Sequence, residues 1–456
     1  MPAQPTTTLS PSIITELEKV IQGDVLHDTY SLGLYSTDAS FYQIRPLVVV
    51  VPKDETDVKK AVEVARSHKI KILPRGGGTS LAGQTVGEAM VLDFSKYMNN
   101  ILELNTEARW VRVQPGLVRD ELNPVMAKHK LHFAPDPATT SRANVGGMVG
   151  NNSSGTKSIL YGKTVDHVLE AKILLADGTE LLLKECSREE FEEKARQPNR
   201  EGQIYRSFKE IIDQNNEEIK DRFPKVMRRV GGYNLDEFVY TDKWNLAKVI
   251  TGSEGTLGVI LDLKLNLEPL PKFKSVVVVH FADLLESIRA VEPMLPYKPS
   301  AIEIIDSTVL ALGYENLTTR QHTHFLQGQP AAIQIVEFYG DTAADVINRA
   351  HTMVADLKKQ SLGYAYPVFP EGREYDDVWL LRKKGLGLMM GIKSEKRALS
   401  FIEDSAIPVR FLPEYIDQVL KICEKYNAPV SLYAHASVGV IHVQPLLDLR
   451  EQKEIE

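Results

Sequence analysis

The chain contains 456 residues, of which 43% are hydrophobic and 25% are charged, a composition typical of soluble globular proteins. This length predicts two to three domains and a core large enough to need no disulfide or metal, and the net charge of −7 gives no indication of a nucleic-acid partner. Because Cys186 and Cys423 are the only cysteines, the sequence excludes a disulfide framework, a C-x-x-C zinc site and an iron–sulfur cluster within this chain.

The apolar runs of the sequence are short. Leu47–Val51 is a representative one, and no run approaches the roughly 18 consecutive apolar residues of a membrane span. The N-terminal sequence MPAQPTTTLS lacks the basic stretch and the following apolar stretch of a secretory signal. The sequence therefore predicts a cytoplasmic protein without a transmembrane segment.

The first third of the chain predicts alternating helices and strands. Ser10 suits the N-cap of an initial helix and Pro11 suits its first turn, and apolar residues then recur on one helical face. The apolar runs that follow predict a β-α-β order that ends in a run of glycines. The expected strands cover 47–51, 70–73, 90–94 and 110–113, and the expected helices start at residue 56 and cover 118–129.

The middle of the chain passes from an irregular stretch to a strongly patterned one. Residues 135–162 are rich in Gly, Ser, Asn and Thr, as is typical of a long functional loop. Asp177-Gly178 lies between two apolar runs and predicts a β-hairpin over 168–183, after which charged helices are expected. Leucines then alternate with polar residues over 261–267, which predicts a half-buried strand.

Two prolines, Pro269 and Pro271, interrupt this pattern and indicate a domain boundary. We therefore expect one domain over 1–270 and a second over 271–456. The second domain repeats a strand–helix–strand pattern, which is typical of a ferredoxin-like α+β sheet. The two copies cover residues 275–305 and 331–368.

A run of three glycines follows the strand predicted over 70–73. Gly76, Gly77 and Gly78 allow the backbone to approach a ligand closely, and successive N–H groups can form an anion-binding nest for a diphosphate. The loop from Pro74 to Gln84 contains neither G-x-G-x-x-G nor the lysine of a P-loop, so a nicotinamide-type Rossmann site and an ATP site are poor fits. A flexible turn is the alternative interpretation.

Two further segments are rich in small residues. The second, residues 137–155, continues to Gly162 and is dense in backbone and side-chain donors. The third, residues 251–258, comes immediately before the alternating strand. Because whole elements separate the three segments, their ordered set predicts one large polar ligand bound between them.

With these segments, the chain resembles the flavoproteins of the vanillyl-alcohol oxidase (PCMH) type, in the branch of D-lactate, glycolate and D-2-hydroxyglutarate dehydrogenases. The resemblance covers residues 35–450. It implies an α+β protein with a two-lobed PCMH-type FAD-binding domain, followed by a ferredoxin-like cap domain that carries the substrate site. Some relatives attach FAD through a His of the first loop. Here Thr79 follows the glycines and the loop contains no His, so non-covalent FAD is expected.

The same resemblance distributes the contacts to FAD among the segments. The first segment would wrap the diphosphate with Arg75, Gly76, Gly77, Gly78, Thr79, Ser80, Gly83 and Gln84. The second would line the flavin with Pro137, Thr140, Ser141, Gly146, Gly147, Asn152, Ser154, Gly155, Ser158 and Tyr161. Val168 would lie near the adenine, and the site would be closed by Glu254, Gly255, Gly258, Val259 and Ile260.

A pair of histidines, His435 and His442, stands near the C-terminal end. Their spacing of seven would place the imidazoles on opposite faces of a straight strand, and they converge only if the backbone turns, which Gly439 permits. One core and one surface histidine is the alternative. The resemblance implies instead that both bind a zinc-like divalent metal, which holds the substrate and makes its hydroxyl easier to deprotonate before hydride passes to the flavin.

Arg382 matches the position that the family uses for the substrate carboxylate, and an arginine fork suits that geometry. A solvated basic helix face, formed with the two lysines that follow, is the alternative. The sequence also departs from the family. Val443 stands where an Asn usually follows the second His, and the lysine that the family uses near residues 401–404 has no counterpart, which argues against a dicarboxylate substrate.

We therefore expect an FAD-dependent dehydrogenase of a small D-2-hydroxy acid, with D-lactate as the leading substrate and a non-oxygen electron acceptor. The variant histidine segment resembles the sub-branch fused to an iron–sulfur module, so such a module or subunit is the expected acceptor and would bring the protein to the membrane periphery. The alternatives are a D-2-hydroxyglutarate or glycolate dehydrogenase, an alkyl-transferring synthase, and a flavin-binding fragment or subunit without turnover of its own.

The end of the sequence predicts a chain that is incomplete as a catalyst. Two imidazoles do not fill a tetrahedral metal site. The resemblance implies a Glu ligand and a His base after the second histidine, but none of the fourteen residues that follow His442 is His. Glu451, Glu454 and Glu456 lie in a highly charged tail that is typical of the start of a solvated helix. We expect FAD binding with weak or no turnover from residues 1–456 alone.

Overall fold

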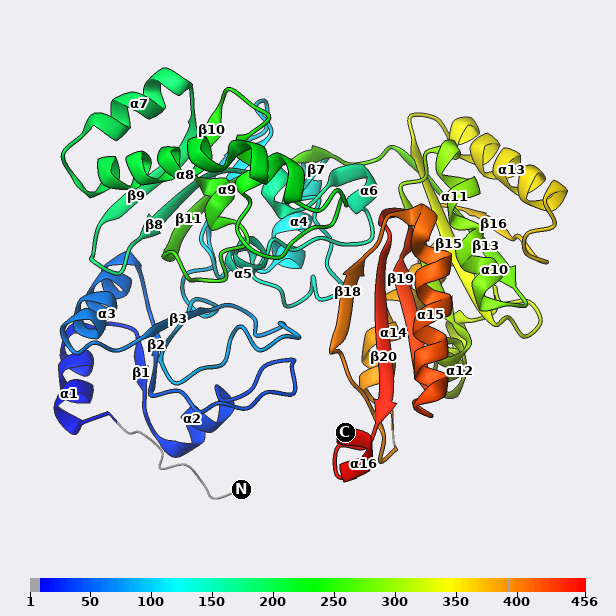
Figure 1. Cartoon of the computed structure of the whole chain (residues 1–456), viewed down its shortest axis with the longest axis horizontal. Coiled ribbons are helices and arrows are strands. Elements are labelled where there is room, and N and C mark those ends of the chain that lie inside the picture. The colour runs from blue at the N-terminus through cyan, green and yellow to red at the C-terminus, as the bar shows by residue number, and fades with distance from the viewer. Residues whose placement is uncertain (1–8, 393) are drawn as a thin grey trace. The chain divides into compact units, whose positions relative to one another are not determined.

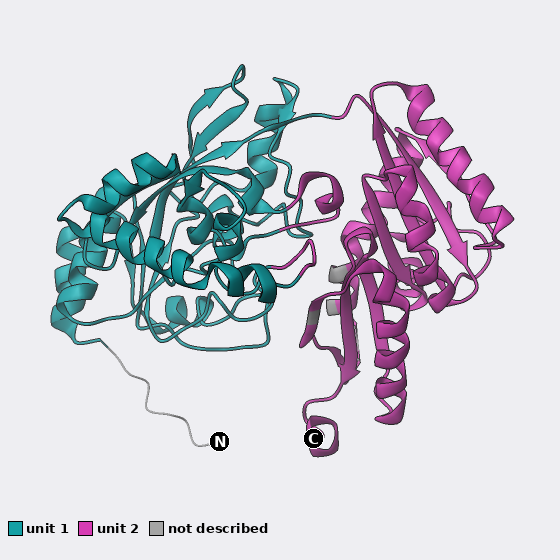
Figure 2. Cartoon of the chain, turned by 45° about the horizontal axis from the view of Figure 1, so that its top comes forward, with its two compact units in different colours: residues 1–153, 163–224, 230–270 teal, residues 154–162, 225–229, 271–456 magenta. Residues whose placement is uncertain are grey.

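The computed structural model describes residues 9–392 and 394–456, which form two compact units (Figure 1). The first unit comprises the described residues up to Ser153 together with 163–224 and 230–270. The second comprises 271–456 and two short segments from earlier in the sequence, 154–162 and 225–229 (Figure 2). The second unit therefore contains residues that precede the boundary expected from the prolines.

One lobe of the first unit is built on a four-stranded sheet. Its order is β1 (Asp24–Leu26), β2 (Val48–Val51), β4 (Met90–Asp93) and β3 (Ile72–Arg75), with β2, β4 and β3 parallel and β1 antiparallel. Helices α1 (Pro11–Val20) and α3 (Glu55–Ser67) contribute to the same core. All four valines of β2 are buried. A continuous apolar run of this kind is typical of a strand in a parallel sheet that is covered on both faces.

The other lobe is built on a six-stranded antiparallel sheet. Its order is β10 (Trp244–Asn245), β9 (Glu180–Cys186), β8 (Val168–Leu174), β11 (Val259–Asn266), β6 (Trp110–Val113) and β5 (Ile101–Asn105). The helices of this lobe are α4 (Arg119–Ala127), α7 (Arg188–Arg196), α8 (Arg200–Arg222) and α9 (Ala247–Ile250). Trp244 is buried among Phe191, Phe208 and Phe238, whose rings meet it edge to face.

Short elements occur where the sequence pattern predicts loops. The stretch expected to be irregular contains α5 (Val145–Asn151) and α6 (Ser158–Tyr161). In α5, the packing of Met148 and Val149 into the core overrides the low helix propensity of the neighbouring glycines. The remaining short elements are α2 (Thr29–Leu34), β7 (Leu131–His132) paired with β12 (Glu268–Pro269), and the 3₁₀ turns η1 (Thr164–His167) and η2 (Leu235–Phe238).

The second unit is an α+β domain around one antiparallel sheet. The order is β16 (Val368–Pro370), β13 (Phe273–Phe281), β15 (Ala332–Gly340), β14 (Ala301–Asp306), β19 (Val430–His435), β20 (Val440–Leu447) and β17 (Arg397–Ala398), and β18 (Ile402–Ala406) also pairs with β20. Strand β20 ends at Leu447, and α16 (Gln452–Ile455) lies in the charged tail where the sequence predicted the start of a helix.

Helices cover both faces of this sheet, because its strands carry apolar residues on both sides. One core contains residues of α10 (Leu284–Arg289), α11 (Val291–Met294), α13 (Ala343–Lys359) and α15 (Leu412–Lys425). The other contains residues of α12 (Ser307–Glu315) and α14 (Arg373–Met390). Short 3₁₀ turns, η3 (Leu295–Tyr297), η4 (Arg320–His322), η5 (Val409–Phe411) and η6 (Ala436–Val438), connect the elements. None of the helices in the described ranges is both long and apolar enough to cross a bilayer.

A buried carboxylate in the first lobe provides a test of how this lobe is held together. Asp57 accepts hydrogen bonds from the N–H groups of Gln22, Gly23 and Lys53 at 2.9, 2.8 and 3.0 Å. Asp57→Asn turns an amide N–H group toward main-chain donors, so we expect the free energy of unfolding to fall by about 2 kcal/mol in urea denaturation. Asp54→Asn is the matched control, because Asn caps α3 as well as Asp does, and an equal loss in that variant would contradict the assignment.

Candidate active site

The first two small-residue segments are in close contact in the first unit. A Cβ added to Gly77 would lie 2.2 Å from the carbonyl oxygen of Arg142, and one added to Gly76 would lie 3.1 Å from the side chain of Asn144. Gly77 has no room for a larger residue, and a side chain at Gly76 would require Asn144 to shift. The glycine loop after β3 therefore lies directly against the residues that begin α5.

The third segment joins the other two. The N–H groups of Gly252 and Glu254 donate to the carbonyl oxygens of Val149 and Gly150 at 2.8 and 2.9 Å. The side-chain amide of Gln84, from the first segment, donates to the Glu254 carboxylate at 3.2 Å. Parts of all three segments that the sequence singled out therefore converge within the first unit, and only residues 154–162 of the second segment belong to the other unit.

A fourth segment, which the sequence analysis did not identify, reaches the same place. Gly146 and Val145 donate their N–H groups to the carbonyl oxygens of Pro115 and Leu117, both at 2.8 Å. Between these, Gly116 passes so close to β4 that a Cβ there would lie 1.9 Å from the carbonyl oxygen of Phe94. The only sequence signal for this segment is a single Gly after a strand.

Arg75 was expected on the diphosphate, and its guanidinium is engaged with the main chain. It donates to the carbonyl oxygens of Tyr35, Thr37 and Thr85 at 3.2, 2.8 and 3.0 Å. Burial lowers the pKa of Arg75, against the opposing effect of Asp93 and Asp38. Its side chain therefore holds residues 35–37 against the glycine loop.

Open backbone and unsatisfied acceptors at this convergence fit a large polar ligand such as FAD. Among the described residues, the buried Oδ1 of Asn144 and Oε1 of Gln84 accept no hydrogen bond, a state that costs about 1–3 kcal/mol unless a ligand donates. Gly147 and Gly150 lie on α5, and a Cβ on either would have no atom within 4 Å. The residues of the three segments would hold the diphosphate and the flavin there.

The other residues assigned to FAD are divided between the two units. Val168 begins β8, Val259 and Ile260 lie on β11 just after Gly258, and Thr140 donates to Asp120 at 2.9 Å in the turn that also contains Pro137 and Ser141. Four residues from the end of the second segment cluster with the second unit, where α6 contacts β14 and η6. These are Ser154, Gly155, Ser158 and Tyr161.

The two histidines of the second unit converge. His435 ends β19 and His442 lies on β20, and the chain between them turns through η6 and Gly439, whose φ is +69°. A Cβ on Gly439 would lie 1.8 Å from the carbonyl oxygen of Ile407, so only glycine fits. The two ring centroids are 5.1 Å apart, with the ring planes at 82°.

Glu303 connects His435 to Arg382. It lies on β14 directly opposite His435, and its side chain has no exposed surface. His435 Nδ1 lies 2.9 Å from both carboxylate oxygens, and Arg382 of α14 donates from Nε at 2.8 Å and places Nη2 at 2.6 Å. The arginine predicted to bind substrate and the first histidine therefore share one carboxylate.

The charge states of this group follow from its burial. Burial lowers the pKa of His435 to about 4, although Glu303 opposes the shift, so the imidazole is neutral at pH 7. Burial raises the pKa of Glu303, but the hydrogen bond from His435 and the charge of the Arg382 guanidinium outweigh it and hold that pKa below its ordinary value. A neutral imidazole that donates Nδ1–H to an ionised carboxylate has its lone pair on Nε2.

A second buried carboxylate lies on the neighbouring strand. Glu337 forms an ion pair with Lys157 at 3.1 Å and accepts hydrogen bonds from Ser300 Oγ at 2.7 Å and from the hydroxyl of Tyr375. The Lys157 ammonium also lies 3.4 Å from the ring centroid of Trp379. Lys157 therefore brings a cation from the flavin-assigned segment into the second unit.

His442 also has a carboxylate behind it. Its Nδ1 is 3.4 Å from Asp404 Oδ1, and its ring stacks on Tyr433 with a centroid separation of 4.3 Å. Arg228 is buried and places Nη2 4.0 Å from the same Asp404 oxygen. The Asp404 side chain is 47% exposed, and its partial burial raises its pKa, but His442 and Arg228 outweigh this effect and hold the pKa below its ordinary value.

Two buried donors around these residues, the Nε1 of Trp379 and the Oγ of Ser437 in η6, have no hydrogen-bond acceptor in the described part of the protein. The Nη2 of Arg382 nearby contacts Glu303 as an ion pair at 2.6 Å. Trp379 and Arg382 are three residues apart on α14 and therefore share a helix face. A ligand rich in acceptors, such as a carboxylate, would satisfy them.

The histidine pair has the surroundings of metal ligands, but the described residues do not complete a metal site. A carboxylate on the Nδ1 side of each imidazole is the usual arrangement behind metal-bound histidines. In residues 9–392 and 394–456, no group of three His, Cys, Asp or Glu side chains is placed to hold a metal ion. Because a catalytic zinc usually has three protein ligands, His435 and His442 provide two of the donors that such an ion needs.

Sequence reasoning did not identify four charged residues of this site. Glu303 carried a signal, because it is a charged residue inside the apolar run of β14, and such a residue is buried only when paired. Asp404 lies in a strand with no distinctive pattern. Lys157 and Arg228 come from sequence assigned to the first domain, so only the tertiary fold places them here.

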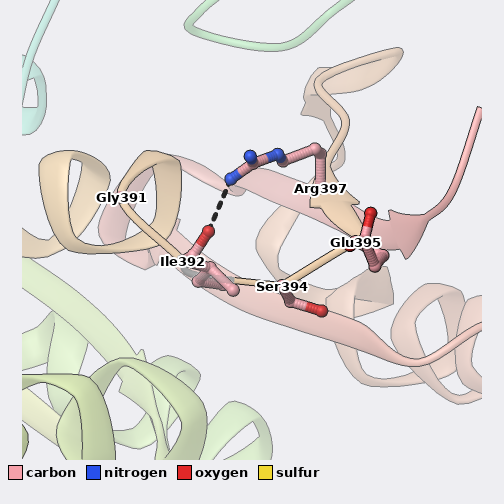
Figure 3. A pocket seen from close by; sticks show the side chains of 5 residues that line it. All are labelled: Gly391, Ile392, Ser394, Glu395 and Arg397. Carbon is pink, nitrogen blue, oxygen red and sulfur yellow. Dashed lines mark hydrogen bonds between the residues drawn. The ribbon is translucent and has the colours of Figure 1, made fainter.

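A surface hollow at the end of α14 is a weaker candidate. Gly391, Ile392, Ser394, Glu395 and Arg397 line it, and Arg397 donates to the carbonyl oxygen of Ile392 at 2.6 Å (Figure 3). Its three polar side chains are exposed to solvent, where contacts to charged groups contribute little. The buried cluster around Glu303 is therefore the better candidate for chemistry.

Comparisons with known families match both halves of the chain. Residues 46–184 match the FAD binding domain, and residues 270–456 match the C-terminal domain of the FAD linked oxidases. The backbone superposes on p-cresol methylhydroxylase with substrate bound with a TM-score of 0.69 at 16% identity, over 97% of this chain and 84% of that one. This likeness shows a PCMH-type fold, as the sequence predicted.

Curated relatives cover nearly the whole chain. The D-2-hydroxyglutarate dehydrogenase of Pseudomonas putida is 35% identical over 94% of this chain, which spans 44% of that relative's length. The glycolate oxidase subunit GlcD of Bacillus subtilis is 23% identical, over 93% of this chain and 78% of its own length. The mitochondrial D-lactate dehydrogenase of Kluyveromyces lactis is also 23% identical, over 97% and 70%.

A single glycine tests whether the converging segments bind flavin. A side chain on Gly147 meets no protein atom, so Gly147→Val should fold normally and lose most of its bound flavin if the ligand occupies that space. Absorbance at 450 nm per mole of purified protein measures this. Gly33→Val is the matched control, because it is also an exposed helical glycine without neighbours. Equal flavin content in both variants would show that the ligand lies elsewhere. Gly77 is unsuitable, because any side chain there collides with Arg142.

Proposed function

This chain belongs to the FAD-linked oxidases, and from that premise we propose that it oxidises a D-2-hydroxy acid to the 2-oxo acid, with non-covalent FAD as the hydride acceptor. The observation that supports the proposal best is the group of buried donors beside an oriented imidazole. Arg382, Trp379 and Ser437 offer N–H and O–H groups to a carboxylate, and His435 stands next to them.

Each residue of the group has a role in this reaction. The Arg382 guanidinium binds Glu303 through its Nε edge, so its remaining edge can bind the substrate carboxylate. The neutral His435 presents its Nε2 lone pair toward the substrate hydroxyl or toward a divalent metal that acidifies it. Bound FAD would supply the acceptor for the hydride that leaves the substrate carbon. The burial of Glu303, Arg382 and His435 excludes water from these charges.

For the substrate we propose D-2-hydroxyglutarate ahead of the D-lactate expected from the sequence. The relatives with the higher identity are D-2-hydroxyglutarate dehydrogenases. The missing family lysine argued against a dicarboxylate, but the fold brings the buried Arg228 from a distant segment to Asp404. Arg228 is our candidate for the second carboxylate. D-Lactate is the second candidate, supported by its dehydrogenase among the relatives.

We further propose that His435 and His442 share a divalent metal. The buried and half-buried charges of the site balance, because Lys157, Arg228 and Arg382 face Glu303, Glu337 and Asp404. A dicarboxylate adds two negative charges to this neutral set, and a divalent cation on the imidazoles would compensate for them. An iron–sulfur module or subunit is the proposed electron acceptor, as the resemblance implies.

Anaerobic reduction of the bound flavin tests the reaction and the substrate. D-2-Hydroxyglutarate should bleach the flavin absorbance, and its L-enantiomer should not. Arg228→Gln should raise the half-saturating concentration of D-2-hydroxyglutarate about 10-fold more than that of D-lactate, since a hydrogen bond to a charged group contributes about 1.5–3 kcal/mol. Bleaching by D-lactate alone would select the second candidate, and a flavin that no 2-hydroxy acid reduces would contradict the proposed activity of this chain.

Metal analysis tests the histidine pair. His435→Ala and His442→Ala should each lower the bound divalent metal and the rate of flavin reduction, while the flavin content stays unchanged because the flavin-binding segments converge in the first unit. His351→Ala, an exposed histidine on α13, is the control. Full activity in excess chelator would assign His435 the role of proton acceptor instead.

A further inference from the structure

Glu303 is a fully buried carboxylate in the middle of an apolar sheet. On β14 its neighbours along the strand are Ile302, Ile304 and Ile305, all buried. Taking an ionised carboxylate out of water costs several kcal/mol, and an apolar residue of similar size would fill the position without that cost. Packing alone therefore does not explain why a glutamate occupies position 303.

The contacts of Glu303 supply that reason. In the described part of the protein, its two oxygens contact groups of the proposed catalytic site, the Nδ1 of His435 at 2.9 Å and the guanidinium of Arg382 at 2.6 and 2.8 Å. The strand pairing makes the first contact inevitable, because Glu303 and His435 are directly opposed across β14 and β19. Cross-strand neighbours on one face lie within contact distance.

We propose that Glu303 is a positioning residue that sets the tautomer of His435 and the orientation of Arg382. This inference rests on the proposed function. A carboxylate only accepts, so it requires the proton of His435 on Nδ1 and leaves the lone pair on Nε2, which is the form that takes up a proton or a metal ion. By binding the Nε edge of Arg382, the same carboxylate directs the other edge of the fork toward an incoming carboxylate.

Glutamine at this position has a specific consequence. A Gln side chain has one acceptor oxygen, and Arg382 can only donate, so the oxygen goes to Arg382. The amide N–H₂ then faces His435 Nδ1, which must accept, and the imidazole proton moves to Nε2. Glu303→Gln therefore keeps the arginine anchored and reverses the tautomer of His435.

The tautomer can be read without turnover. In protein with ¹⁵N-labelled histidine rings, the wild type should show His435 with a protonated Nδ1 and an unprotonated Nε2 at pH 7, and Glu303→Gln should show the reverse. The His435 signals are assigned by their loss in His435→Gln. Glu337→Gln is the matched control, since that carboxylate is equally buried on the adjacent strand but binds Lys157, Ser300 and Tyr375, and it should leave the His435 pattern unchanged.

Kinetics provides the second measurement. Glu303→Gln should slow flavin reduction about 10- to 100-fold, as loss of a group that orients a catalytic histidine usually does, while the half-saturating substrate concentration changes far less. Glu303→Asp, which keeps the acceptor, should recover part of the rate. An Nε2-protonated His435 in the wild type, or an unchanged rate in Glu303→Gln, would overturn the proposal. The ¹⁵N spectrum of wild-type His435 tests the proposed tautomer even if Glu303→Gln does not fold or if the protein oxidises no 2-hydroxy acid.

Discussion

A charge removed from water persists only where other groups compensate for it, and the second unit is organised by this constraint. Glu303 and Glu337 lie on adjacent strands under α14, and neither has exposed side-chain surface. Each forms an ion pair with a basic side chain, Arg382 in one case and Lys157 in the other. Removing one partner would leave a buried charge unpaired, at a cost of about 3–5 kcal/mol. The two buried carboxylates therefore fix the positions of Arg382 and Lys157 in the second unit.

The first unit follows a different constraint, the close approach of main chains. Four segments cross near the start of α5, and at Gly77, Gly116 and Gly146 a Cβ would lie 1.9–2.5 Å from a neighbouring residue. Where Gly147 and Gly150 face open space, the absence of side chains exposes helix backbone instead. Glycine thus has two functions here, tight packing of the protein against itself and access for a ligand, and only the structure distinguishes them.

The histidine hairpin combines both constraints. Gly439 makes the turn that brings His435 and His442 together, and Glu303 and Asp404 lie on the Nδ1 side of the two rings. An imidazole that is oriented in this way is neutral because of burial and has a defined lone pair. Residues 270–456, which match the C-terminal domain of the FAD linked oxidases, supply the fold around this group. In the proposed reaction, the choice of substrate depends on which cations that fold brings to the group.

The amino-acid sequence by itself determined the local structure and the flavin segments. Alternating leucines identified β11, the Asp177-Gly178 turn identified the hairpin of β8 and β9, and three small-residue segments indicated one large ligand, because these signals depend on neighbours within a few residues. Tertiary structure alone decided that Lys157 and Arg228 join the second unit and that Glu303 lies opposite His435. Residues 303 and 435 are brought together by strand register, and register depends on how whole strands pair rather than on any pattern within one of them.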